Sequence, residues 1–174
     1  MDANINLVDG SGKRIGSIDK LEAHAGGILH EAFSIFVFNE NNELLIQKRS
    51  LQKYHSGGLW TNTCCSHPLV GEDIRFAIHR RLMEEMGFDC ELESVYSFVY
   101  KTGLLENNLI ENEFDTIFVG HIKKETKVIP NKDEVCDYRW ISMEDLIKEI
   151  KTNPELFTVW FKIIIDSPDF LKVM

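Results

Sequence analysis

The stretch WTNTCCSHPLVGEDIRFAIHRRLMEEMGF, residues 60–88, decides the fold of this 174-residue chain. In its second half, apolar residues recur at steps of three and four, which predicts an amphipathic helix that buries one stripe. That stripe consists of Ile74, Ala77, Ile78, Leu82 and Met86. Gly87 follows the last of them, and glycine adopts the left-handed conformation of a helix cap without steric penalty. We therefore expect the helix to end there.

The same stretch brings several chemically active side chains together. Its first half contains Cys64, Cys65 and His67, and in its second half Arg81 and Glu85 lie about one helical turn apart. An Arg–Glu pair with this spacing has two interpretations. It is either an exposed ion pair that contributes little to stability, or part of a functional site.

The pattern around this pair resembles the signature of the Nudix family, G-x5-E-x7-R-E-U-x-E-E-x-G-U, where U is an aliphatic residue. Glu72 and Arg80 match it, and the box-like segment spans residues 66–88. Two positions differ, because Ser66 replaces the first glycine and Arg81 replaces a glutamate. In Nudix pyrophosphohydrolases that glutamate binds metal. A cation in its place argues against hydrolysis and suits a residue that holds a diphosphate.

The preceding segment TNTCCSHP, residues 61–68, resembles the type I isopentenyl-diphosphate isomerases of the Nudix superfamily, and the similarity extends from Lys20 to Trp160. It implies an α/β fold, a Nudix-type α/β/α sandwich with a mixed sheet. It also implies an enzyme of isoprenoid biosynthesis. Such an enzyme interconverts isopentenyl diphosphate and dimethylallyl diphosphate by protonation and deprotonation through a tertiary carbocation.

Composition restricts the class of protein. The chain has the length of a single domain, residues 1–174, and 28 acidic against 19 basic residues give a formal net charge of −9. This charge disfavours nucleic acid and anionic membranes as partners. The amino terminus has no signal-peptide pattern, and no apolar run reaches the ~18 residues that span a bilayer. We expect a soluble, cytoplasmic monomer or homodimer whose partner is a small-molecule diphosphate.

Patterns outside residues 60–88 predict the other elements. Turn residues between apolar runs predict hairpins, alternating runs predict strands, and a near capping box at Ser142 predicts the start of a helix. In chain order the elements are a hairpin over residues 5–18, a second hairpin with strands 31–38 and 44–46, strands 92–100, 109–118 and 135–141, a helix over 142–150, and a last helix over 155–165.

Five side chains are candidate ligands for one divalent ion. On the predicted strand over residues 109–118, Glu111, Glu113 and Asp115 share a face, because side chains alternate in direction along a strand. Such a row indicates either an open, solvated face or a metal site. The resemblance implies a metal site with Glu111 and Glu113 as ligands. It adds three histidines from distant parts of the chain, His24, His30 and His67. This donor set suits Zn²⁺ or Mn²⁺, with Mg²⁺ as the alternative.

The resemblance also implies how the substrate is held and converted. Glu85 would hold a Mg²⁺ ion that accompanies the diphosphate. Cys65 and Glu113, with Tyr100 beside Glu113, would form the acid–base pair. Trp160, which composition alone would place in the core, would instead close the pocket and stabilise positive charge with its ring. Charge-assisted hydrogen bonds to the diphosphate would come from four cations, Lys20, Arg49, Lys53 and Arg81.

Strand geometry distinguishes the two adjacent thiols. If residues 61–67 are extended, Thr63, Cys65 and His67 point to one side and Cys64 points to the other. Because His67 is a metal ligand by resemblance, Cys65 would lie on the metal side. Cys64 would then pack as a small apolar residue on the opposite side of the sheet.

Two other functions compete with isomerisation. A Nudix pyrophosphohydrolase acting on a nucleoside or prenyl diphosphate would require a complete acidic box, and Arg81 argues against it. A binding module without catalysis would not require a thiol, three histidines and the E-N-E triplet together. Isomerisation therefore accounts for more of the pattern than either alternative.

Overall fold

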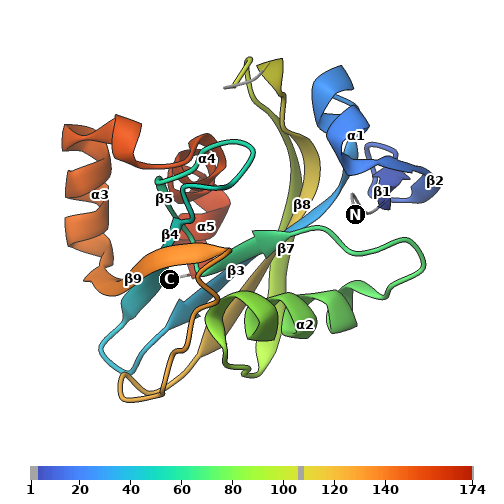
Figure 1. Ribbon diagram of the computed structural model, residues 1–174. Helices are drawn as coiled ribbons and strands as arrows, with labels where there is room; N and C mark the ends of the chain where they lie inside the picture. Colours follow the sequence, from blue (N-terminus) through green and yellow to red (C-terminus); the bar gives the residue numbers. More distant parts are fainter. Residues whose placement is uncertain (1–3, 106–107, 174) are drawn as a thin grey trace.

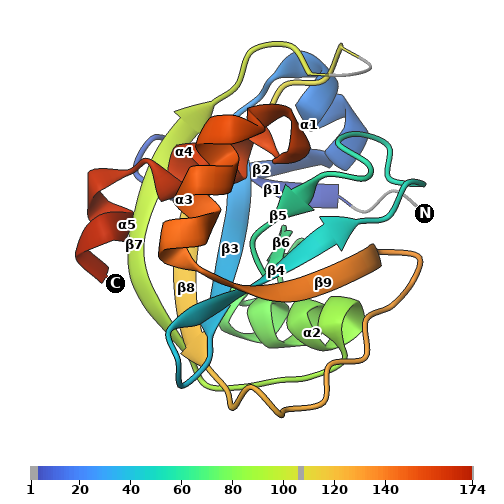
Figure 2. The same ribbon diagram turned by 90° about the vertical axis from the view of Figure 1, so that its left-hand side faces the viewer.

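The computed structural model describes residues 4–105 and 108–173, which form an α/β sandwich around a sheet of nine strands. The strands are β1 (Asn4–Val8), β2 (Arg14–Asp19), β3 (His30–Phe38), β4 (Glu43–Arg49), β5 (Trp60–Thr61), β6 (Cys64–Ser66), β7 (Leu92–Lys101), β8 (Asn112–His121) and β9 (Val135–Ser142). The helices are α1 (Lys20–Gly26), α2 (Ile74–Met86), α3 (Met143–Thr152), α4 (Val159–Ile165) and α5 (Pro168–Val173). Helix α2 covers one face of the sheet, and α3, α4 and α5 cover the other (Figure 1 and Figure 2).

Strand β3 lies at the centre of the sheet. It runs parallel to β8, with His30 opposite Glu113 and Phe38 opposite His121. It is antiparallel to β1, β4 and β6. A parallel pair requires a long crossover connection, and here the connection includes α2. The sheet is therefore mixed, and the predicted Nudix-type α/β/α arrangement is confirmed.

Alternation along β3 builds two separate cores. Phe33, Ile35 and Val37 pack on the α2 side, together with Cys64 and the predicted apolar stripe of the helix. Phe36 and Phe38 point to the other face and pack with α3, α4 and α5. Cys64 is fully buried in the first core, whereas Cys65, the next residue along β6, contacts the second core. The strand parity predicted for the two thiols is therefore observed.

A short segment fills a gap between β3 and β4. These strands pair only at Phe38 and Leu44 and then diverge, so β6 pairs with β3 and β5 pairs with β4. Between β5 and β6 the backbone leaves the extended conformation, and the Thr63 hydroxyl replaces the missing ladder bonds. It accepts from the Val37 N–H at 2.9 Å and donates to the Leu45 carbonyl at 2.6 Å. Residues 60–66, from β5 to β6, therefore lie between β3 and β4 and place Cys65 where these two strands diverge.

Two helical assignments differ from the sequence prediction. The predicted last helix over residues 155–165 is wrong at its start, because Pro154–Leu156 is a short 3₁₀ turn and α4 begins only at Val159. The extended residue Thr158 separates them and donates its N–H to the Trp60 carbonyl at 3.0 Å. Two further helices, α1 and α5, were not predicted. No helix within residues 4–105 and 108–173 is both long and apolar enough to cross a bilayer.

The box-like segment holds α2 in place. Glu72, in the loop before the helix, accepts two hydrogen bonds from the Arg80 guanidinium at 2.7 and 2.8 Å. At the other end, Gly87 adopts the predicted left-handed conformation, with φ of 71°. A Cβ atom at this position would lie 2.3 Å from the Ile129 carbonyl oxygen. Glycine is therefore required here both for its backbone conformation and for space.

Candidate active site

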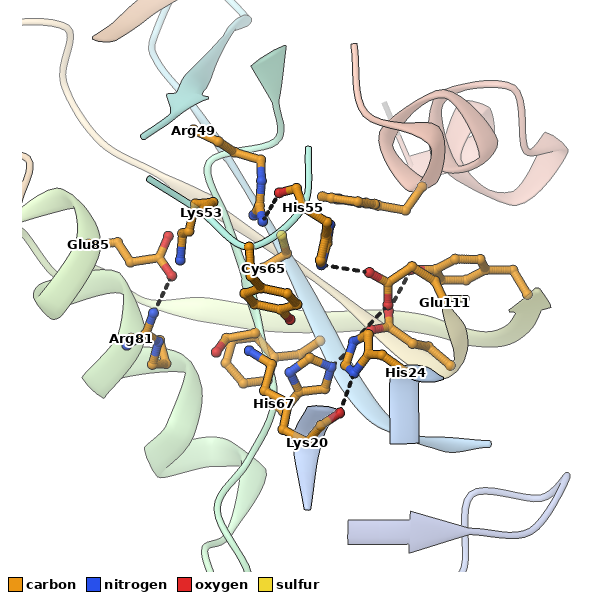
Figure 3. Close-up of a pocket in the computed structure, with 16 residues that line it drawn as sticks. Lys20, His24, Arg49, Lys53, His55, Cys65, His67, Arg81, Glu85 and Glu111 are labelled. Carbon is orange, nitrogen blue, oxygen red and sulfur yellow. Dashed lines mark hydrogen bonds and ion pairs between the residues drawn. The ribbon is translucent and has the colours of Figure 1, made fainter. Parts of the chain in front are cut away.

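One cavity brings together the side chains that the sequence implicated. It opens where β3 and β4 diverge, between α1, the loop after β4, the start of β8 and the first turn of α4 (Figure 3). Of the thirteen predicted site residues, all but His30 line this cavity. His30 is fully buried, with its Nε2 atom 3.2 Å from Nε2 of His67. The lining residues among them are Lys20, His24, Arg49, Lys53, Cys65, His67, Arg81, Glu85, Tyr100, Glu111, Glu113 and Trp160.

The predicted metal ligands fall into two neighbouring groups that share His24. Nε2 of His24 lies 3.0 Å from Oε2 of Glu111. Oε1 of Glu113 lies 2.9 Å from Nε2 of His67 and 3.5 Å from Nε2 of His30. The ligand atoms of the three histidines and Glu113 lie within 4.8 Å of one another, and those of His24, His55 and Glu111 form a second group within the same distance. Side chains from α1, from β3, from β8 and the residue before it, and from the residue after β6 thus converge.

The hydrogen-bond partners of two imidazoles suit a bound cation. Nδ1 of His24 lies 2.6 Å from the Lys20 carbonyl, and Nδ1 of His30 lies 2.7 Å from the Ile28 carbonyl. A carbonyl only accepts, so both Nδ1 atoms carry the proton and both Nε2 atoms present lone pairs in the neutral rings. These lone pairs face carboxylates. Nε2 of His24 and Oε2 of Glu111 are buried without a hydrogen-bond partner among the described residues. A divalent ion would satisfy this set of acceptors.

Burial makes the three carboxylates between residues 111 and 115 unusual. The strand predicted from residue 109 begins only at Asn112, so Glu111 lies just before β8, and Glu111, Glu113 and Asp115 are all buried. The interpretation as an open, solvated face is therefore wrong. Burial and the neighbouring Glu113 charge raise the pKa of Glu111 and of Asp115, which accepts a hydrogen bond from Ser34 at 2.8 Å. Burial also lowers the pKa of His67 to about 3, which favours its neutral form.

The predicted acid–base pair reaches the cavity from two sides of β3. Cys65 lies on β6, opposite Ser34, and Glu113 lies on β8, opposite His30. The Tyr100 hydroxyl donates to Oε2 of Glu113 at 2.5 Å, which orients the carboxylate. Burial raises the pKa of the Cys65 thiol to about 12. The thiol therefore stays protonated at neutral pH, as an acid must before it donates.

Trp160 forms one wall of the cavity and is 4% exposed. Its indole Nε1–H donates to Oγ1 of Thr61 at 3.0 Å, so β5 fixes the orientation of the ring. The Arg49 guanidinium lies 5.2 Å from the ring centroid. Trp160 thus belongs both to the core, as composition predicts, and to the cavity, as the resemblance predicts.

Four cations converge beside the acid–base pair. Burial, and then the charge of Lys53, lower the pKa of Lys20, which shows how closely the positive charges approach. Arg49 and Arg81 each have a buried Nε–H without a hydrogen-bond partner among the described residues. Unpaired guanidinium donors are costly unless an anion accepts from them. The cluster therefore suits a diphosphate.

Glu85 does not belong to the His/Glu cluster. Its side chain is 6% exposed, so the interpretation of the Arg81–Glu85 pair as an exposed ion pair is wrong. Oε1 lies 2.5 Å from Nη2 of Arg81, and Oε2 accepts from the Gln47 amide at 2.8 Å. Neither group of potential ligands found in the described residues includes Glu85. A second ion at Glu85 stays a prediction.

Two site residues were missed by the sequence reasoning. His55 is buried in the loop between β4 and β5, with Nε2 3.1 Å from Oε1 of Glu111. Burial lowers its pKa to about 2. The adjacent Tyr54 ring lies under the Lys20 ammonium at 5.3 Å. The sequence K-Y-H-S-G-G has no regular spacing to the other ligands, so periodicity could not identify these residues.

Comparisons with known proteins agree with this architecture. Residues 28–161 match the NUDIX domain family. The chain is 53% identical over 173 residues to isopentenyl-diphosphate Delta-isomerase 2 of Photorhabdus laumondii subsp. laumondii, covering 99% of this chain and 96% of that protein. It is 48% identical over 166 residues to isopentenyl-diphosphate Delta-isomerase of Burkholderia multivorans, covering 95% and 93%.

Solved structures share the fold at much lower identity. A MutT protein from Methanosarcina mazei Go1 gives a TM-score of 0.64 at 16% identity, covering 83% of this chain and 91% of that chain. A MutT Nudix hydrolase from Burkholderia pseudomallei gives 0.62 at 15% identity, covering 84% and 98%. At these identities the likeness concerns the fold alone.

Proposed function

This chain belongs to the Nudix family and, within it, to the isopentenyl-diphosphate Delta-isomerases, and from this premise we propose how its residues interconvert isopentenyl and dimethylallyl diphosphate. The observation that carries the proposal is the shared cavity of Cys65 and Glu113, which approach it from strands on opposite sides of β3. A 1,3-proton shift requires an acid and a base in separate positions around one carbon skeleton. In the cell the reaction would serve isoprenoid biosynthesis.

The reaction needs one proton added and one removed. Isopentenyl diphosphate carries an unactivated terminal alkene. Protonation of its terminal carbon leaves a tertiary carbocation, and loss of a proton from the neighbouring methylene gives the dimethylallyl isomer. We assign these transfers to Cys65 and to Glu113, with Tyr100 orienting Glu113 through its hydroxyl. The π system of Trp160 would stabilise the cation by about 2 kcal/mol in a site without water.

We assign the divalent ion to the His/Glu cluster. His24, His30, His67, Glu111 and Glu113 would hold Zn²⁺, Mn²⁺ or Mg²⁺, and the buried lone pairs described above support this assignment. When bound, the ion would supply positive charge that neutralises the adjoining carboxylates. The residues themselves come from four separate elements, so metal binding would also stabilise the fold.

We assign substrate anchoring to the four cations. Lys20, Arg49, Lys53 and Arg81 line the same cavity, and the unpaired Nε–H groups of the two arginines support an anionic ligand. Mg²⁺ accompanying the diphosphate would lie near Glu85. Hydrolysis is the less favoured activity, because a hydrolase would have an acid at position 81. Here Arg81 occupies that position and pairs with Glu84 at 2.7 Å and with Glu85.

A direct assay tests the function. The purified protein, incubated with isopentenyl diphosphate and Mg²⁺, should form dimethylallyl diphosphate and release no phosphate. Cys65→Ser should abolish both isomerisation and deuterium incorporation in D₂O. Cys64→Ala is the matched control and should keep most of the activity, because Cys64 packs in the α2 core. Phosphate release without isomerisation would instead identify a hydrolase, and exchange lost only in the Cys64 variant would refute the catalytic assignment.

A further inference from the structure

His55 is a fourth imidazole beside the metal cluster, and its surroundings differ from those of the predicted ligands. It is 4% exposed and reaches Glu111 from the opposite direction to His24, as Figure 3 shows. Its Nε2 atom lies 3.1 Å from Oε1 of Glu111, while Nε2 of His24 lies 3.0 Å from Oε2. The two imidazoles therefore hold the two oxygens of one carboxylate.

The partner of Nδ1 distinguishes His55 from the ligands. In His24 and His30 this atom faces a backbone carbonyl, which forces Nδ1 to carry the proton. In His55 it lies 3.2 Å from the Ser56 hydroxyl, which is able to donate. Donation from Ser56 leaves the ring proton on Nε2, directed at the carboxylate of Glu111. His55 is thus arranged as a hydrogen-bond donor, whereas His24 is arranged as a lone-pair donor.

The backbone holds this arrangement at a conformational cost. Ser56 has φ of 51°, a left-handed conformation that is uncommon for a residue with a side chain. Such conformations persist where the surrounding structure enforces them, and they cluster at functional sites. The His55 carbonyl also accepts from Nη2 of Arg49 at 3.2 Å. The loop is therefore tied to the cation cluster as well as to Glu111.

The other side of the ring meets the cavity wall. His55 and Trp160 contact edge to face, with ring centroids 5.6 Å apart and planes at 85°. Tyr54 lies on a further side at 4.4 Å, also edge to face. Because the ring is enclosed in this way, a rotation that broke its contact with Glu111 would also disturb the indole.

We propose that His55 is a positioning residue that connects the metal site to the aromatic wall. Its Nε2–H donates to Oε1 of Glu111 and so directs Oε2 toward the ion shared with His24, while its edge supports Trp160. Carboxylate ligands of metals are commonly held by such outer hydrogen bonds, whose loss lowers metal affinity 10–100-fold. The role rests on the proposed function, since it assumes the ion in the His/Glu cluster.

The test measures metal affinity without substrate. Competition with a chelating indicator should show that His55→Leu, which fills similar space but donates nothing, binds Zn²⁺ and Mn²⁺ about 10–100-fold more weakly. His55→Gln should recover most of the affinity, because its amide N–H can replace Nε2–H. His79→Leu is the matched control. That histidine pairs with Asp89 on the exposed side of α2, and its loss should leave affinity unchanged.

A spectroscopic measurement separates positioning from direct ligation. The visible absorption bands of the Co²⁺-loaded protein should keep their positions in both His55 variants, because the ion retains the same ligands. Equal affinity in wild type and His55→Leu would overturn the proposal. It would also be overturned if His55→Gln bound as weakly as His55→Leu and both showed shifted Co²⁺ bands, because His55 would then be a ligand itself.

The outcome for His55 can be told apart from failure of the proposed function. If wild-type protein binds the ion but does not isomerise isopentenyl diphosphate, the function is wrong and the affinity series still decides the role of His55. Should His55→Leu fold poorly by circular dichroism, Ser56→Ala provides a milder test. It removes the hydroxyl that sets the tautomer, and it should weaken metal binding relative to wild type. Unchanged affinity in a folded Ser56→Ala variant would count against the proposal.

Discussion

Replacing Thr63 by valine should destabilise the protein strongly, although the two side chains have nearly the same shape. The Thr63 hydroxyl is fully buried and bridges the gap between β3 and β4, accepting from the Val37 N–H and donating to the Leu45 carbonyl. Valine would leave both backbone groups buried without a partner. Each unsatisfied group costs about 1–3 kcal/mol, so the free energy of unfolding should fall by about 2–6 kcal/mol. That is a large fraction of the ~5–15 kcal/mol typical of a folded domain.

Urea denaturation followed by circular dichroism measures this loss. Thr63→Ser keeps the hydroxyl and removes one methyl group, so it should cost only about 1 kcal/mol. Thr152→Val is the matched control, because that hydroxyl donates to the Lys148 carbonyl at an exposed helix end, and its loss should change stability by less than ~0.5 kcal/mol. If Thr63→Val lowered the free energy of unfolding no more than the control, the Thr63 hydroxyl would not replace the missing hydrogen bonds between β3 and β4.

Three further predictions concern the box-like segment and the metal cluster. Arg81→Ala should weaken substrate binding by about 1.5–3 kcal/mol, seen as a raised KM, and unchanged KM and kcat would reduce Arg81 to a partner of Glu85. His67→Ala should lower both metal content and activity, and a wild-type protein that bound no divalent ion under any loading condition would refute the site. Glu72→Gln should lower the free energy of unfolding by about 0.5–1 kcal/mol at pH 7, measured by urea denaturation. Hydrogen bonds from Arg80 lower the pKa of Glu72 in the folded state, so its stabilisation is present above the unfolded pKa. The difference between wild type and variant should shrink as the pH falls below about 4, and a difference independent of pH would contradict the role of the ion pair.

Local patterns identified most elements because they depend on neighbouring residues. The helix over 74–86 and its glycine cap follow from apolar spacing and from the absence of a Cβ atom. The opposite directions of Cys64 and Cys65 follow from strand parity alone. The last helix was misplaced because its start depends on a long-range contact: the N–H of Thr158 is bound by Trp60, nearly a hundred residues earlier.

Burial was the property that local patterns could not supply. Glu111, Glu113 and Asp115 were expected on one face, and both a solvated and a metal-binding face agreed with their spacing. The fold excludes the solvated face, because all three carboxylates are buried, with Glu111 and Glu113 beside imidazoles and Asp115 beside the Ser34 hydroxyl. The same applies to Arg81 and Glu85, whose spacing fits an exposed pair and whose environment is the cavity.

The sequence by itself determined the family, the α/β class, the apolar face of α2 and the identity of thirteen candidate site residues, because motifs, periodicity and chemistry are properties of the chain in order. Only the tertiary structure showed which groups lie against each imidazole nitrogen, since these partners come from distant parts of the chain. It alone added His55, whose contact with Glu111 joins residues more than fifty positions apart. This contact arises because the loop between β4 and β5 folds over the start of β8, and no local spacing encodes it.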